Sequence, residues 1–548
     1  MEPIFTDKQL NNMSREDLIS LMKIVQEQTK KKDTEIQLLK DKQKELEFLN
    51  AMLSDRLTLA QRKQFGASSE KYAEGYEQMN LFNEAEASAD AETEELFEEI
   101  RPSSYKRKKR KGKKEEDLSN FETVETRTYK LEGEARYCPE CGKKYSVVTK
   151  ETVKRLRFVP AKFEVEEEIT YVYSCPKCGA MKRPEKEPSL IRGSIATPSL
   201  VAGIMNAKYV NGMPLARQER EFARYDLDLS TKTMANWIIN CADRYLKPLY
   251  QLMKEELLES RYIHCDESRI QVLGEPEQKG TTQNWMWVYL TDEFSGSPQM
   301  VLFDYERTRA GYHPVNFLGN RFHGYLTCDG YQAYHSLGEG IIVSGCLTHA
   351  RRRFDAALTA LKKDFTKEQL KETVAYQAMS RIGILYKIEE MIHDKTPEEK
   401  YEERQKQSRP VMDAMFEWLH TMEDSVDRSS LIGDAILYTL NQEVYLRRYL
   451  EDGHLSIDNN SAERALKNFA VGRRNWLFAK SVRGADASAL VYSITETALL
   501  NHLKPYKYLT YILDELRKIG AFPKEEELKK LLPWSEDLPE YCRTKLKK

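Results

Sequence analysis

Two short apolar segments that each end in a Cys-Asp pair constrain the fold of this chain more than any other feature. They are residues 263–266 (IHCD) and 326–329 (LTCD). In a β-strand, successive side chains point to opposite faces, so Asp266 shares a face with His264, and Asp329 shares a face with Thr327. We expect each aspartate at the end of its strand. Neighbouring strands in this register would place the two carboxylates side by side on one sheet.

A third carboxylate, Glu463, opens a predicted helix after residues 458–460 (DNN). Two strand carboxylates and one helix carboxylate form a ligand set suited to two-metal phosphoryl transfer. Like charges at close range are costly unless cations neutralise them, and ligand sets made only of oxygen suit Mg²⁺ or Mn²⁺ rather than zinc. We therefore predict a catalytic site with two Mg²⁺ (or Mn²⁺) ions, held by Asp266, Asp329 and Glu463.

Each of these carboxylates also has a structural interpretation. An aspartate that ends a strand often begins a turn, which accounts for Asp266 and Asp329 taken singly. Glu463 is three residues after Asn460, the spacing of a capping box at a helix N-terminus. The repeated local context of the two aspartates favours the metal site.

Four cysteines form two CxxC motifs, at 138–141 (CPEC) and 175–178 (CPKC). A glycine follows each motif and permits the tight turn that points two thiolates at one metal. We predict one structural Zn²⁺ ion bound in tetrahedral geometry by four thiolates, with strands between the motifs, for example over 164–172. The predicted ligands are Cys138, Cys141, Cys175 and Cys178.

The bulk composition excludes several classes of protein. Apolar residues make up 41% of the 548 positions, but no apolar run approaches the roughly 18 residues that span a bilayer. Nine cysteines in a chain of this length do not form a disulfide scaffold, and the first ten residues lack a secretory pattern. These features predict a cytoplasmic protein. The net charge of −2 does not by itself indicate nucleic-acid binding.

Apolar positions seven apart over residues 14–58 predict a coiled coil that pairs two chains into a homodimer. Several core positions of this repeat are polar, which leaves a single surface helix as the alternative. Residues 83–120 are rich in like-charge blocks and low in aromatic residues, as in disordered linkers. The basic stretch 106–114 either contacts phosphates or serves as a solvated tether.

A helix–turn–helix pattern occupies the region before the first Cys-Asp segment. One helix is predicted over 215–225, a turn over 226–229, and a second helix capped by Ser230. This spacing would present a recognition helix to a DNA major groove, although helix pairs with a short turn are common in protein cores. The side chains placed toward the groove are Thr231, Lys232, Thr233 and Asn236.

Basic residues beside Glu463 are candidates for binding DNA phosphates. They are Lys467, Arg473, Arg474, Lys480 and Arg483. A second basic group follows a predicted strand at 341–346 and would steady the scissile phosphate, unless its loop is purely structural. This group comprises His349, Arg351, Arg352 and Arg353.

The predicted fold class is a multidomain α+β protein, whose parts run in sequence order. They are a coiled-coil helix (1–60), a basic-aromatic segment with a charged linker (61–125), a four-cysteine zinc-binding β module (126–190), helix-turn-helix-like DNA-binding helices (191–258), a first part of a catalytic core (259–360), a helical insertion (361–452), a second part of the core with the Glu helix (453–520) and a tail (521–548).

Further motifs extend along most of the chain. They are HCDES at 264–268, CDGY at 328–331, CLTHARR at 346–352, DNNSAER at 458–464, GRRNWLF at 472–478, FG at 65–66 with SEK at 69–71, the two CxxCG motifs and LPW at 532–534. In these motifs the chain resembles the insertion sequence sixty-six family of bacterial transposases. Ser268 stands where the family is expected to have threonine, which does not affect metal ligation.

The resemblance implies an RNase-H-like α/β catalytic core with a DDE triad, carried here by Asp266, Asp329 and Glu463. The implied reaction is cleavage at the ends of a mobile element by an activated water, followed by attack of the freed 3′-hydroxyl on target DNA. Expected partners are the terminal inverted repeats, target DNA and accessory proteins of the same element, in the bacterial cytoplasm and at the nucleoid when bound to DNA.

Two other readings stay open. His349-Ala350-Arg351-Arg352 contains the H-x-x-R step of a tyrosine recombinase, but none of the 30 tyrosines has the setting of a nucleophile. A catalytically inactive zinc-dependent DNA-binding repressor, derived from a transposase, would keep the fold and lack the reaction.

Overall fold

The computed structural model describes residues 133, 139–140, 143, 163–174, 176–178, 181–277, 282–338, 340–362 and 364–545. The predicted coiled coil, basic-aromatic segment and charged linker lie outside these residues. The described chain divides into a helical unit, residues 344–453, and a sheet unit, which comprises the residues up to 343 together with 454–545. Among the described residues, no helix is both long and apolar enough to cross a bilayer.

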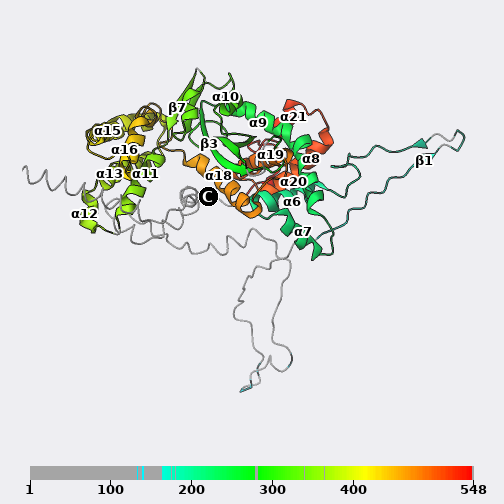
Figure 1. The fold of residues 1–548 in the computed structure, drawn as a ribbon. Coiled ribbons are helices and arrows are strands. Elements are labelled where there is room, and N and C mark those ends of the chain that lie inside the picture. The colour runs from blue at the N-terminus through cyan, green and yellow to red at the C-terminus, as the bar shows by residue number, and fades with distance from the viewer. Residues whose placement is uncertain are drawn as a thin grey trace, which may run out of the picture. The chain divides into compact units, whose positions relative to one another are not determined.

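The sheet unit is built on five strands in the order β5-β4-β3-β6-β7, of which Figure 1 labels β3 and β7. Strands β3, β4 and β5 form an antiparallel meander, and β6 lies parallel to β3 on its other side. The strands are β3 Tyr262–Gln271, β4 Gln283–Thr291, β5 Met300–Glu306, β6 Gly324–Cys328 and β7 Ile341–Gly345. Four of them lie where the apolar runs predict strands over 285–290, 299–304, 325–329 and 341–346.

The expectation that the first Cys-Asp strand ends at its aspartate is wrong. Strand β3 continues for five residues beyond Asp266, because β4 pairs with it as far as Gln271 opposite Gln283. Asp329, in contrast, directly follows the last residue of β6. The two aspartates therefore differ in local backbone, although they lie at the same level of the sheet.

The free edge of β5 is covered by a helix rather than left open. The Val301 amide donates to Thr497 Oγ1 at 3.0 Å, and the Phe303 amide donates to Ser493 Oγ at 2.8 Å. Both hydroxyls belong to α19 (Val482–Leu500), which is buried along most of its length. Pairing these edge amides removes a site for aggregation and fixes α19 against the sheet.

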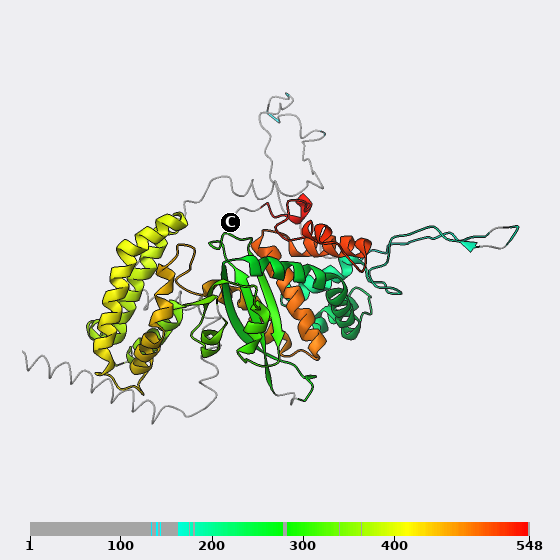
Figure 2. The same ribbon diagram turned by 90° about the horizontal axis from the view of Figure 1, so that it is seen from above.

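The remaining helices of the sheet unit surround the sheet (Figure 2, in green, orange and red). They are α6 Pro198–Met205, η3 Asn206–Val210, α7 Leu215–Ala223, α8 Thr231–Cys241, η4 Ala242–Leu246, α9 Lys247–Glu259, α10 Tyr312–Leu318, η5 Gln332–Ser336, α18 Asn460–Trp476, α20 Pro505–Ile519, α21 Glu525–Lys529 and η8 Glu540–Cys542. The predicted helix pair is confirmed as α7 and α8, and Ser230 caps α8 by accepting from the Thr233 amide at 3.2 Å.

The helical unit lies where helical periodicity resumes in the sequence. Helix α11 packs against α13 and α16, and α13 packs against α15. Its elements are α11 Leu347–Leu361, α12 Lys367–Glu372, α13 Val374–Ile392, α14 Pro397–Glu403, η6 Arg404–Ser408, α15 Arg409–Glu423, α16 Leu431–Asn441, α17 Glu443–Leu446 and η7 Arg448–Leu450. The buried Arg404 holds the unit together: it makes two hydrogen bonds to Glu389, at 2.9 and 2.6 Å, and donates to the carbonyls of Tyr449 and Asp452.

The strand predicted over residues 164–172 is not formed. In this region, pairing among the described residues is confined to β1 (Tyr173–Ser174) and β2 (Met181–Lys182). Residues 164–172 are exposed along their whole length, and four of them are glutamates. An alternating sequence forms a strand only where a second strand pairs with its backbone groups.

A buried carboxyl on α19 makes stability depend on pH. Glu496 is buried, and both of its carboxyl oxygens accept from the Asn468 amide, at 3.1 and 3.2 Å. Burial raises the pKa of Glu496 to about 7, against a smaller opposing effect of the Asn468 hydrogen bonds. The unfolded chain ionises this group near pH 4.5. Stability therefore falls between pH 4.5 and 7 and stays lower above that window.

Glu496→Gln is expected to increase the free energy of unfolding more at pH 8 than at pH 5, because glutamine has no charge to bury at either pH. The gain should be about 2.5 kcal/mol larger at pH 8. Urea denaturation at the two pH values measures it, with the exposed Glu526→Gln as control. Equal effects of Glu496→Gln at both pH values would show that the buried carboxyl does not carry the dependence.

Candidate active site

The three predicted metal ligands come together in the sheet unit. His264 lies opposite Thr327 in the parallel pairing of β3 and β6, and the same register puts Asp266 level with Asp329. Burial raises the pKa of Asp266 well above its usual range, and the charges of Glu267, Asp329 and Glu463 raise it further. A buried carboxylate whose ionisation is opposed by neighbouring carboxylates is a place where a cation would bind favourably.

The start of α18 is fixed to β3 by a buried hydrogen-bonded chain. Asn459 donates through Nδ2 to the Cys265 carbonyl at 2.8 Å, so its Oδ1 faces His264 Nδ1 at 2.9 Å. His264 Nε2 lies 3.0 Å from Asp292 Oδ2, which also accepts from the Ser456 hydroxyl. Asn459, His264 and Asp292 are all buried. This chain holds the first turn of α18, and with it Glu463, beside the strand that carries Asp266.

The charge state of His264 follows from these partners. Because Asn459 Oδ1 and Asp292 Oδ2 can only accept, both ring nitrogens of His264 donate and the ring is an imidazolium. Burial alone would lower the pKa of His264, but the Asp292 charge and hydrogen bond, the Asn459 hydrogen bond and the Asp458 charge together raise it. Burial likewise opposes ionisation of Asp292, but the His264 charge and the hydrogen bonds from His264, Ser456 and the Phe294 amide together lower the pKa of Asp292.

The capping-box interpretation of Glu463 is wrong. Helix α18 begins at Asn460 with Asn459 as its N-cap, so Glu463 is the fourth residue of the helix. A capping box would need the acidic side chain at the third position. The Asn459 side chain makes no capping hydrogen bond, because it makes hydrogen bonds to Cys265 and His264 of β3 instead.

A second buried network lies on the other face of β3. Glu267 Oε1 accepts from Arg309 Nε at 2.6 Å, and its Oε2 accepts from the Tyr334 hydroxyl. Burial raises the pKa of Glu267 to about 7, with a contribution from Asp329, while Arg309 and Tyr334 oppose the shift. The sequence analysis missed this network. Glu267 follows Asp266 directly, which is a signal, but the sequence offers none for Arg309 or Tyr334.

Arg309 connects this network to the carboxylate site. Its Nη2 lies 3.9 Å from Asp329 Oδ2. The guanidinium lies 3.9 Å from the centre of the Tyr331 ring and 4.9 Å from that of Trp285. Contacts with these two rings restrict the movement of the Arg309 guanidinium. Arg309 thus offers a fixed positive charge beside Asp329.

The predicted phosphate-binding residues near Glu463 are placed along α18 and after it. Lys467 and Arg474 are exposed, as is Lys480. Arg473 is half-buried and donates to the Arg269 carbonyl. Arg483 forms an exposed ion pair with Asp243.

On α8 the hydroxyls are used internally. Thr231 donates to Glu219 of α7, and the Thr233 hydroxyl lies 2.9 Å from that of Ser230. Lys232 and Asn236 are exposed. Of the residues proposed to face a groove, these two side chains are the accessible ones.

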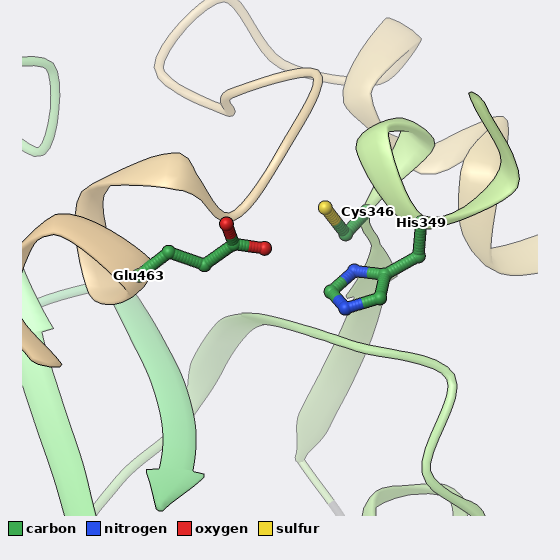
Figure 3. A group of neighbouring side chains, drawn as sticks. All are labelled: Cys346, His349 and Glu463. Atoms are coloured by element: carbon green, nitrogen blue, oxygen red, sulfur yellow. The ribbon is translucent and has the colours of Figure 1, made fainter. Parts of the chain in front are cut away.

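His349 and its neighbours belong to the helical unit. Cys346 is the N-cap of α11 and His349 lies in its first turn (Figure 3). Arg351 lies 5.6 Å from the centre of the Tyr386 ring. Arg352 is half-buried, and Arg353 pairs with Asp434. These basic side chains lie close together because α11 carries all of them.

Of the predicted zinc ligands, Cys178 is exposed in the hairpin loop between β1 and β2. Cys138, Cys141 and Cys175 lie outside the described residues. The donor set of four thiolates suits zinc.

Comparison with known proteins matches three family descriptions. "Transposase IS66 family" matches residues 193–487, "zinc-finger binding domain of transposase IS66" matches 135–179, and "Transposase C of IS166 homeodomain" matches 52–120. The first range contains Asp266, Asp329 and Glu463, and the second contains all four predicted zinc ligands.

Curated relatives include two proteins of Sinorhizobium fredii (strain NBRC 101917 / NGR234). The uncharacterized protein y4hP is 31% identical over 412 residues, covering 72% of this chain and 73% of the relative. The uncharacterized protein y4jD is 29% identical over 418 residues, covering 74% of this chain and 79% of the relative. The family match spans more than half of the chain and includes the whole helical unit. The chain therefore belongs to the IS66 family of transposases and carries that family's zinc-finger domain.

Proposed function

We propose that this protein is a DDE transposase that cleaves DNA strands at the ends of a mobile element and joins them to target DNA. The observation that carries the proposal is the convergence of Asp266, Asp329 and Glu463 from β3, β6 and α18. Transposase family membership implies DNA as the partner. The arrangement of the site indicates which residues would perform the reaction.

The three carboxylates fit divalent metal ions that favour oxygen ligands, Mg²⁺ or Mn²⁺. Asp266 is buried and is repelled by neighbouring carboxylates, and a bound cation would offset both effects. When bound, such ions supply Lewis-acid stabilisation and lower the pKa of a water nucleophile. The protein's own part is to orient the carboxylates: the Asn459–His264–Asp292 chain fixes α18, and parallel pairing fixes the two aspartates.

The sheet supports an RNase-H-like assignment for the core. Its antiparallel meander β3-β4-β5 is extended on the β3 side by the parallel strand β6 and then by β7. Carboxylates on the central strand β3, directly after its neighbour β6 and on a following helix are what this assignment requires of a DDE enzyme. The helices of residues 344–453 interrupt the core between β7 and α18 in sequence.

A cleavage assay on purified full-length protein tests this function. The substrates are duplexes carrying the DNA ends that flank the element, incubated with and without Mg²⁺. We expect strand cleavage that requires Mg²⁺ and leaves a 3′-hydroxyl, followed by joining to a second duplex. A covalent protein–DNA adduct would indicate a tyrosine recombinase instead. Specific binding with no cleavage under any metal would indicate a repressor.

Loss of one thiolate is expected to release the zinc ion. Cys175→Ser should lower the zinc content of the purified protein from about one ion per chain to a small fraction, since structural sites need all four ligands. It should also make residues 130–185 sensitive to limited proteolysis. Elemental analysis measures the metal, with the buried Cys542→Ala as control. Unchanged zinc content in Cys175→Ser would remove this cysteine from the ligand set.

A further inference from the structure

An exposed apolar tip follows α18. Leu477 is 65% exposed and Phe478 is 42% exposed, although both are large and apolar. Single apolar residues on a surface are ordinary. Two adjacent ones at the end of the helix that carries Glu463 are not explained by packing within the described chain.

The tip is held in an uncommon backbone conformation. Leu477 has φ +65, a left-handed value that a bulky side chain rarely adopts. Hydrogen bonds fix the turn: the Leu477 amide donates to the Arg473 carbonyl at 2.7 Å, and the Ala479 amide donates to the Gln271 carbonyl at 2.8 Å. Such conformations persist where the surroundings enforce them, and they cluster at functional sites. The turn therefore presents the two apolar side chains rigidly, from a base that includes the end of β3.

Positive charge surrounds the tip. Arg473 donates to the Arg269 carbonyl, and Arg474 and Lys480 are exposed on either side of the apolar pair. Burial lowers the pKa of Arg473, and the neighbouring charges of Arg474 and Arg269 lower it further. Mutually repelling guanidinium groups are a favourable place for a polyanion.

The same face of α18 leads from Glu463 to the tip. Residues at helical spacing share a face, which aligns Glu463 with Lys467 and Arg474. At 1.5 Å per residue, Leu477 lies about 21 Å beyond Glu463 along the helix axis. Duplex DNA rises 3.4 Å per base pair, so this length corresponds to about six base pairs.

We propose that Leu477 and Phe478 form a wedge that enters the DNA duplex about six base pairs from the cleaved phosphate and unstacks one base step. The inference rests on the proposed function and deepens it. Apolar side chains stack on or separate bases irrespective of sequence, while flanking arginines bind the phosphates on both sides of the opened step. Opening the duplex there would allow the cleaved end to bend toward the carboxylate site.

The charge around the tip favours DNA over a protein partner. A protein-docking surface of comparable size is depleted in charge at its centre, whereas this apolar pair lies directly beside Arg473, Arg474 and Lys480. Docking of a second copy of the chain is an alternative outcome that the experiment below separates.

The test uses element-end duplexes that carry 2-aminopurine at one position at a time, bound to the full-length protein in Ca²⁺. Unstacking raises the fluorescence of 2-aminopurine. We expect the wild-type protein to raise it at about six base pairs from the cleavage site. Leu477→Gly and Phe478→Ala should abolish the rise and slow Mg²⁺-dependent cleavage about ten-fold. Leu477→Gly is compatible with positive φ, so it should keep or raise the melting temperature.

Phe522→Ala is the matched control, because Phe522 is 94% exposed in the same unit and lies between α20 and α21 rather than at the end of α18. A two-base mismatch at the affected step should restore cleavage by Phe478→Ala, which a merely structural role would not allow. Unchanged fluorescence and cleavage in both wedge variants would overturn the proposal, as would altered oligomeric state with unchanged fluorescence. Unstacking by a wild-type protein that never cleaves would instead overturn the proposed function and leave the wedge standing.

Discussion

Asp266→Asn, Asp329→Asn and Glu463→Gln are each expected to abolish Mg²⁺-dependent cleavage while leaving DNA-end binding intact. Each substitution removes one negative ligand without changing the size of the side chain. The metal contribution to transition-state stabilisation is several kcal/mol, so the rate should fall at least about 1,000-fold. Cleavage rates under single-turnover conditions measure the effect, and gel-shift titration with the same duplexes measures binding.

The control for this set is Glu496→Gln, which neutralises a buried carboxyl in the same unit that accepts hydrogen bonds from Asn468. It should cleave at the wild-type rate. Strand transfer retained by any one of the three site variants would remove that residue from the metal site. Loss of binding together with cleavage would indicate a structural role instead.

The second large effect concerns the buried chain that fixes α18. Asp292→Ala leaves the His264 imidazolium without its carboxylate, and breaking a buried ion pair from one side typically costs about 3–5 kcal/mol. We expect a loss of that order in the free energy of unfolding. Cleavage should weaken as well, because the first turn of α18 is no longer held against β3. Urea denaturation and the cleavage assay on the same preparation measure the two effects.

Asp243→Ala provides the contrast. It breaks the exposed Arg483–Asp243 pair, whose side chains are 68% and 42% exposed, and should change stability by no more than about 1 kcal/mol. If Asp292→Ala were as mild as Asp243→Ala, the His264 ring would not be a buried cation, and the account of how α18 is positioned would be wrong.

Much of the fold could be predicted from local pattern. The apolar runs of β4, β5, β6 and β7 alternate with turn formers, and their positions are confirmed within a few residues. The start of α8 could be predicted from Ser230, because a hydroxyl N-cap is a local interaction. Level placement of Asp266 and Asp329 follows from the repeated Cys-Asp context once β3 and β6 are neighbours.

What the sequence did not reveal depends on pairing across long separations. Polar residues 267–269 resemble a turn, yet they continue β3 because β4 pairs with them. Glu267 meets Arg309 across 42 positions and Tyr334 across 67. His264 meets Asn459 across 195 positions. No periodicity within one segment encodes such contacts, so the networks that position the site became visible only in three dimensions.

The exposed position of residues 164–172 has a similar cause. Alternation of apolar and charged residues predicts a strand only where a second strand or a core covers one face. In the described chain the pairing partner is limited to the short β1–β2 hairpin. Local sequence therefore overestimated the extent of the sheet beside the zinc motif.

A crystal structure of the full chain with an element-end duplex and Mn²⁺, in which anomalous scattering locates the ions, tests whether the three carboxylates bind metal. We predict two Mn²⁺ ions coordinated by the carboxylates of Asp266, Asp329 and Glu463. Mn²⁺ absent from these three residues, or Glu463 directed away from an ion held by the two aspartates, would show that the three carboxylates do not form a metal site.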